Sequence, residues 1–110
     1  MTNWTQFETE APDLAKAVAA RFEAHKHHVL ATLRKDGSPR VSGTEVEFYE
    51  GALLLGSMVG ARKVQDLQRD PRFSLHSNPG HHTMVLTTVD GDHLYVDLWR
   101  PGAEVTRFTK

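Results

Sequence analysis

The stretch from Leu53 to Val64, LLLGSMVGARKV, places a strand, a loop and a helix in immediate succession. Three leucines form a short apolar strand that ends at Gly56 and Ser57, and a helix then opens with Arg62 and Lys63. Small loop residues let a ligand approach backbone amides, and the first N–H groups of a helix carry partial positive charge. An arginine can donate two parallel hydrogen bonds to a phosphate, and a lysine adds a compact charge. The stretch predicts a phosphate-binding site, with an exposed basic helix start as the alternative; it lacks the spacing of a Walker loop.

Strand and turn patterns surround this stretch on both sides. Asp36-Gly37 and Asp90-Gly91-Asp92 are hairpin turn sequences between apolar runs. We expect strands at Val29 to Leu33, Arg40 to Tyr49, Leu53 to Leu55, Arg72 to Ser77, Thr83 to Val89, His93 to Trp99 and Glu104 to Phe108. We expect helices at Pro12 to Ala24 and Ala61 to Asp70, and an N-terminal arm pinned by Trp4 and Phe7. The sum is an antiparallel β-barrel or curled sheet with helical caps.

The expected strand from Arg40 to Tyr49 has no cleanly apolar face. Val41 and Gly43 share one face with two glutamates, whereas Ser42 and Thr44 share the other face with Val46 and Phe48. A strand that is polar on parts of both faces predicts a ligand on one side or a partner subunit. Its backbone and hydroxyl groups could hydrogen-bond the edge of a flat heterocycle; an ordinary half-exposed strand is the alternative.

Composition narrows the classes of function. Thirteen Lys and Arg against fourteen Asp and Glu give a formal charge of −1, which disfavours nucleic-acid binding through phosphate contacts. The absence of cysteine excludes a disulfide framework, a Cys-ligated zinc site and a thiol nucleophile. No apolar run approaches the roughly 20 residues that span a bilayer, and no signal peptide is visible. We expect a single cytoplasmic domain over residues 1–110, without membrane or nucleic-acid partners.

The histidines do not form a predicted metal site. His25, His27 and His28 cluster, as do His81 and His82, but stable zinc or copper sites need three or four converging ligands. No acidic residue stands at matching spacing, so solvent-exposed histidines in loops are expected. The sequence also contains no nucleophile-elbow motif, and no catalytic residue is identified from it.

In the order and spacing of its motifs, the run from Val29 to His76 resembles the pyridoxamine 5'-phosphate oxidase-like split-barrel family of flavin and deazaflavin oxidoreductases. The matching pieces are Leu30 to Arg34, Asp36 to Ser42, Leu54 to Ser57, Arg62 to Val64 with Leu67, and Arg69 to Arg72. The N-terminal helix and the hairpin that ends at Trp99 and Arg100 are similar to the ends of family members. The resemblance implies a shortened FMN-binding split barrel: mainly β, antiparallel, with helical caps.

The resemblance further implies a homodimer with two cofactors at the subunit interface. The cofactor is FMN or, alternatively, a deazaflavin coenzyme, since both carry a ring, a ribityl chain and a phosphate. The implied binding positions are the phosphate pair Arg62 and Lys63, the strand-end Ser57 and Met58, the strand against the ring at Arg40, Val41 and Ser42, and the C-terminal Trp99 and Arg100.

One departure from the family concerns the segment from Ser77 to His82. Relatives carry a longer segment there, with another barrel strand and a helix near the site. Three functions are therefore weighed: an oxidoreductase that transfers a hydride to or from an unknown small molecule, a noncatalytic flavin- or haem-binding protein, and a cofactor-free dimerisation module. In the first, the cofactor supplies the redox chemistry and the protein supplies binding and orientation.

Overall fold

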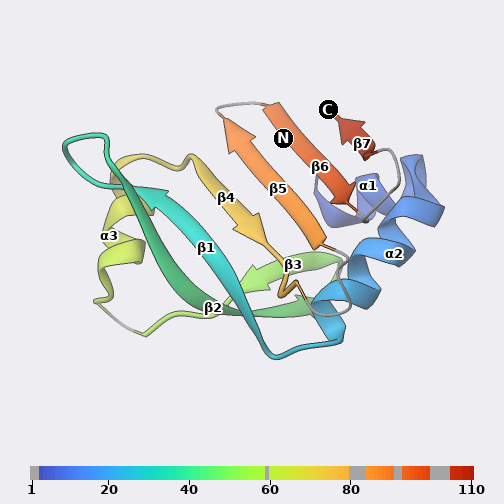
Figure 1. Ribbon diagram of the computed structural model, residues 1–110, viewed down its shortest axis with the longest axis horizontal. Coiled ribbons are helices and arrows are strands. Elements are labelled where there is room, and N and C mark those ends of the chain that lie inside the picture. Colours follow the sequence, from blue (N-terminus) through green and yellow to red (C-terminus); the bar gives the residue numbers. More distant parts are fainter. Residues whose placement is uncertain (1–2, 59, 80–83, 91–92, 100–104) are drawn as a thin grey trace.

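A computed structural model describes residues 3–58, 60–79, 84–90, 93–99 and 105–110 (Figure 1). Its elements in chain order are α1 (Trp4–Glu10), α2 (Pro12–Glu23), β1 (His27–Leu33), β2 (Pro39–Tyr49), β3 (Ala52–Leu55), α3 (Arg62–Arg69), β4 (Phe73–His76), β5 (Met84–Asp90), β6 (His93–Trp99) and β7 (Thr106–Thr109). Each predicted strand and both predicted helices are confirmed, and their ends coincide with the predicted ends or differ by one or two residues.

The strands form a seven-stranded antiparallel sheet in the order β3-β2-β1-β4-β5-β6-β7. Strands that are adjacent in the sheet are consecutive in the chain, except that β1 pairs with β4 as well as with β2. The sheet curls into a half-barrel. Figure 1 shows α1 and α2 at one end of the sheet and α3 at the other. This is the predicted mainly-β split barrel with helical caps.

The N-terminal arm is a helix, which the sequence analysis did not predict. Asn3 begins α1 with a capping box: its Oδ1 accepts from the backbone N–H of Gln6 at 2.9 Å, and its own N–H donates to Gln6 Oε1 at 3.0 Å. The expected pinning by aromatic residues is confirmed. Phe7 is buried, and the Trp4 ring centroid lies 4.7 Å from that of Phe48 on β2. The arm therefore closes one end of the half-barrel.

The core lies between the inner face of the sheet and the helices. On α2, Ala15, Val18 and Phe22 are buried, at the spacing of three and four residues that places side chains on one helix face. Other buried members come from alternate positions of the strands: Leu30, Leu75, Val85, Val96 and Leu98. Full burial of one such side chain contributes about 1.5–3 kcal/mol, so these contacts hold the sheet against α2.

His28 corrects the expectation that the histidines are solvent-exposed. Its side chain is buried at the start of β1. Nε2 lies 2.8 Å from the carbonyl oxygen of Phe22 and 2.9 Å from that of His25, and Nδ1 accepts from the backbone N–H of Asn78 at 2.9 Å. Because Nδ1 accepts, Nε2 carries the proton and donates to both carbonyls. The ring thus ties the end of α2 to the segment after β4; His81 and His82 lie outside the described residues.

Candidate functional site

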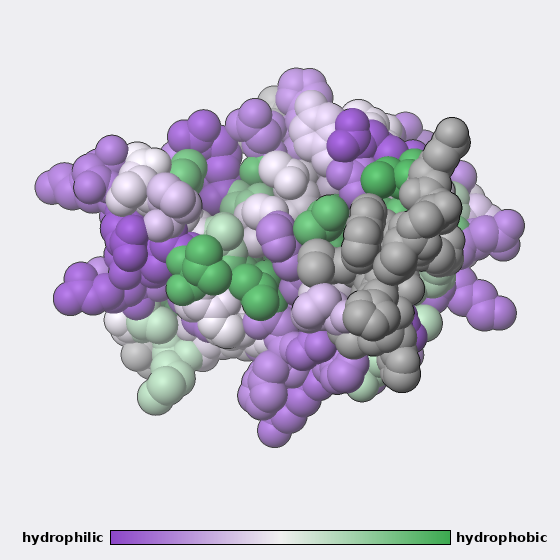
Figure 2. All heavy atoms as spheres, in the orientation of Figure 1, coloured by the Kyte–Doolittle hydropathy of each residue, from purple (hydrophilic) through white to green (hydrophobic). Residues whose placement is uncertain are grey.

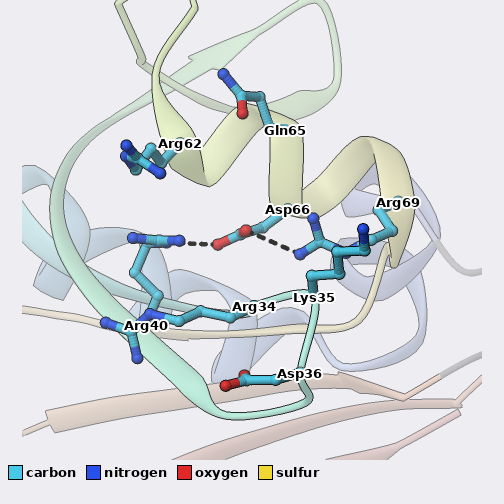
Figure 3. A pocket seen from close by; sticks show the side chains of 8 residues that line it. All are labelled: Arg34, Lys35, Asp36, Arg40, Arg62, Gln65, Asp66 and Arg69. Carbon is cyan, nitrogen blue, oxygen red and sulfur yellow. Dashed lines mark hydrogen bonds and ion pairs between the residues drawn. The ribbon is translucent and has the colours of Figure 1, made fainter.

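A cationic pocket lies between α3 and the hairpin that joins β1 to β2. Its volume is about 330 Å³. It is lined by Arg34, Lys35, Asp36, Arg40, Arg62, Gln65, Asp66 and Arg69 (Figure 3). Five cationic side chains thus face two carboxylates, which leaves a surplus of three positive charges. A pocket of this composition is suited to an anionic ligand.

Asp66 is the centre of the hydrogen-bond network in this pocket. The side chain is buried on α3. Its Oδ2 accepts from Nε of Arg40 at 2.7 Å and from the hydroxyl of Thr32 at 2.8 Å, and its Oδ1 accepts from a terminal nitrogen of Arg69 at 2.9 Å. Figure 3 shows the carboxylate between the two arginines. Arg69 also donates to the carbonyl oxygen of Leu33 at 2.7 Å, so α3 is fixed against β1 and β2.

These contacts keep the Asp66 carboxyl ionised. The pKa of Asp66 is held well below its ordinary value, first by the hydrogen bond from Arg40 and further by those from Thr32 and Arg69; burial opposes this shift. The pKa of Asp36, in the hairpin, is also lowered, because the hydroxyl and then the backbone N–H of Ser38 donate to its carboxylate. The pocket therefore keeps its hydrogen-bonded arginines in place over the whole neutral range.

The structure separates the two basic residues that open α3. Arg62 is exposed and lines the cationic pocket on the Arg40 side of Asp66 (Figure 3). Lys63 does not line it: its Nζ donates to the carbonyl oxygen of Gly43 on β2 at 2.7 Å. Both residues stand in the first turn of α3, whose N–H groups have no partner inside the helix. Arg62 is thus free to contact a ligand, while Lys63 links the helix start to the strand.

β3 covers only part of one edge of β2, and the backbone groups along the rest of this edge have no strand beside them among the described residues. β3 pairs only with positions 46–49 of β2, and the N–H of Gly56 extends this edge by donating to the Glu45 carbonyl oxygen at 2.8 Å. The Gly43 carbonyl faces the same edge, since Lys63 reaches it. Groups that face one edge of an antiparallel strand repeat every second residue. The backbone N–H and C=O of Val41 therefore face this edge as well.

The other predicted site residues differ in their surroundings. Val41 has an exposed side chain on the outer face of the sheet, opposite to Arg40 and Ser42. The Ser42 hydroxyl is buried and has no hydrogen-bond partner among the described residues. In the loop after β3, Ser57 donates to the Met58 carbonyl oxygen at 3.2 Å, and both residues are exposed.

The side chains of the two C-terminal positions carried over from the resemblance are not among those that the structure describes. The backbone of Trp99 ends β6 and pairs with Met84 of β5, and its side chain is not described. Arg100 lies outside the described residues.

Sequence reasoning missed the acidic centre of the pocket. Asp66 lies on α3 between Val64 and Leu67, two apolar residues that are only half-buried. Arg69 was part of the resemblance but received no role. An acidic residue three positions before an arginine on a helix is a weak signal, because such pairs are common on exposed helix faces. The burial of Asp66 depends on the packing of α3 against β1, which local sequence patterns do not indicate.

A family model described as pyridoxamine 5'-phosphate oxidase matches residues 14–78. The chain belongs to this family. The match covers more than half of the chain and includes every residue that lines the cationic pocket. α1, β5, β6 and β7 lie outside it. A comparison with curated proteins finds no match.

Two negative findings apply to the part of the chain that the structure describes. It contains no group of three or more His, Cys, Asp or Glu residues placed to hold a metal ion. None of its helices combines the length and the apolar character needed to cross a membrane.

Proposed function

We propose that this family member binds a phosphorylated flavin-type cofactor, FMN or a deazaflavin, and acts as a homodimeric oxidoreductase on a small molecule. The observation that carries the proposal is the cationic pocket, in which the buried Asp66 holds the half-buried Arg40. The donor set fits a phosphate: guanidinium groups bind phosphate oxygens through paired hydrogen bonds. When bound, such a cofactor supplies hydride-transfer chemistry.

The phosphate would be held by Arg62 and Arg40. Arg62 is exposed at the pocket and lies at the start of α3, where the helix dipole favours an anion. Arg40 uses Nε for Asp66, which leaves its two terminal nitrogens to donate to the ligand. Lys63 contributes charge near the helix start while it remains bound to Gly43.

The ring would lie along the free edge of β2. The backbone N–H and C=O of Val41 face that edge, and they offer one donor and one acceptor to the edge of a flat heterocycle. Ser57 and Met58 stand in the loop between β3 and α3, near the path that a ribityl chain would follow to Arg62. The buried Ser42 hydroxyl faces the other side of the strand, so contact with the ring falls to Val41.

The outer face of the sheet provides a surface for a second copy of the chain. Val41 and Val29 are 68% and 37% exposed, and they lie on adjacent strands of this face. Figure 2 shows apolar groups in the middle of the visible face, with hydrophilic groups around them. Exposed apolar surface beside a ligand site favours a partner subunit.

Gel filtration after incubation with FMN or with a deazaflavin tests the proposal. We expect one of the two to co-elute with the protein, with a Kd in the micromolar range, because the short segment after His76 leaves the ring partly open to water. Loss of co-elution in a variant with both Arg40→Gln and Arg62→Gln would assign the binding to the cationic pocket. Failure of both cofactors to bind the native chain contradicts the proposal and favours a cofactor-free dimerisation module.

A further inference from the structure

A second, larger cavity lies at the other end of the half-barrel, between the inner face of the sheet and helices α1 and α2. Its volume is about 550 Å³, which falls within the roughly 300–1,000 Å³ range of small-molecule sites. None of its lining residues belongs to the cationic pocket. Figure 1 shows α1 and α2 at the end of the sheet opposite to α3, so the two cavities are separate sites.

The walls of this cavity are apolar and partly aromatic. Trp4 and Phe7 of α1, Phe22 of α2 and Phe73 of β4 line it together with aliphatic side chains of the strands. No charged side chain is among the described residues that line it. A charged ligand would therefore lose its hydration without gaining a partner, and the cavity selects for an uncharged molecule.

Among the described strand residues that line the cavity, Thr87 is the one with a polar side chain. It lines the cavity from β5 and is only 8% exposed. Its hydroxyl makes no hydrogen bond with the described residues, and it is not one of the fully enclosed unpaired atoms, which are His25 Nε2 and Ser42 Oγ. The other polar lining residue, Asn3, already caps α1 through its side chain. The Thr87 hydroxyl thus remains available to a ligand within the cavity.

Half of the lining lies outside the stretch that matches the family model. Residues 14–78 include the walls from α2, β3 and β4, but not those from α1, β5 and β6, where Trp4 and Thr87 stand. The cavity therefore depends on parts of this chain that the family match does not cover. It is not explained by the cofactor site proposed above.

We propose that this cavity binds a small uncharged molecule, aromatic or aliphatic, whose single hydroxyl or carbonyl group hydrogen-bonds to Thr87. The size of the cavity, its aromatic walls, the absence of charge and the unpaired hydroxyl carry this assignment. The site functions independently of the flavin-type cofactor, and a ligand there would bridge the N-terminal helices and the sheet.

Isothermal titration calorimetry with 1-naphthol and with naphthalene tests the proposal. The native chain should bind 1-naphthol at one site per chain with a Kd of about 10–100 µM. Thr87→Val keeps the shape of the side chain and removes the hydroxyl. It should weaken 1-naphthol binding about 3- to 10-fold, the value of one hydrogen bond, and leave naphthalene binding unchanged.

A matched pair on β3 locates the bound probe. Leu53 lines the cavity, whereas its neighbour Leu54 is 43% exposed and does not. Leu53→Trp should abolish 1-naphthol binding, and Leu54→Trp should preserve it. Three results would overturn the proposal. The first is equal affinity of Leu53→Trp and Leu54→Trp for 1-naphthol, and the second is no binding by the native chain. The third is loss of the bound probe as the protein concentration rises, which would place a second copy of the chain in the cavity. If Leu53→Trp does not fold, the response to Thr87→Val decides the question.

Discussion

The carboxylate of Asp66 holds Arg40 by its Nε at 2.7 Å, although the two residues stand 26 positions apart on a helix and a strand. The carboxylate is almost fully buried, whereas the arginine side chain keeps 22% of its surface exposed. A guanidinium fixed at Nε can direct both terminal nitrogens towards the pocket. Asp66 is thus a positioning residue for the proposed phosphate site.

Replacement of Asp66 separates positioning from net charge. Asp66→Asn removes a negative charge from a pocket that is proposed to bind an anion, so Coulomb attraction alone predicts tighter binding of FMN. Because Arg40 and Arg69 lose the carboxylate that orients them, we expect binding to weaken about 10-fold. Asp70→Asn is the control, since Asp70 pairs with Arg72 outside the pocket. Fluorescence titration with FMN gives both affinities, and tighter binding in Asp66→Asn would show that Asp66 does not act through the arginines.

The hydrogen bonds of Asp66 make the stability of the fold depend on pH in the acidic range. The pKa of Asp66 lies below its ordinary value of 3.8, chiefly through the hydrogen bond from Arg40, so the unfolded chain binds its proton more readily. The stabilisation by Asp66 is therefore complete above about pH 4 and is lost as the pH falls through the folded-state pKa. Chemical denaturation at several pH values should show a smaller loss of stability below pH 4 in Asp66→Asn than in the native chain. If the free energy of unfolding falls with pH at the same slope in the two proteins, this role of Asp66 is excluded.

The two basic residues at the start of α3 should respond differently to substitution. Arg62→Gln removes a side chain that is free to contact the ligand, and we expect the Kd for FMN to rise 10-fold or more, since a charge-assisted hydrogen bond contributes about 1.5–3 kcal/mol. Lys63→Gln should weaken binding less, because its Nζ is bound to Gly43. Arg72→Gln, outside the pocket, serves as the control. A larger effect at Lys63 than at Arg62 would mean that Lys63 leaves Gly43 for the ligand.

Much of this architecture follows from local sequence patterns. Asp36-Gly37 and Glu50-Gly51 form their turns with positive φ at both glycines, and the alternation along β2 gives the observed exposed and inward faces. α1 was missed because its seven residues offer one buried side chain, Phe7, and its capping box begins with Asn3 rather than Ser or Thr. The burial of Asp66 and His28 was missed because it depends on the packing of α3 and on the segment at Asn78, which are distant in sequence.

The outer face of the sheet should mediate dimerisation. Val41→Arg places a charge at an exposed apolar position on β2 and should convert a dimer into a monomer of half the mass, because a buried unpaired charge opposes association. Val105→Arg alters an equally apolar residue, 48% exposed, before β7 and should leave the dimer intact. Sedimentation equilibrium at micromolar concentration compares the two variants with the native chain. A native chain that sediments as a monomer would refute the shared cofactor site.

The most direct measurement is the ratio of the Kd for riboflavin to the Kd for FMN, because the two ligands differ only by the phosphate. If Arg40 and Arg62 hold that group, native protein titrated by flavin fluorescence should prefer FMN by about 10- to 100-fold. The same ratio in the variant with both Arg40→Gln and Arg62→Gln should fall close to one. A native chain that binds the two flavins equally well, or a preference for FMN that survives the double substitution, would contradict the assignment of the cationic pocket as the phosphate site.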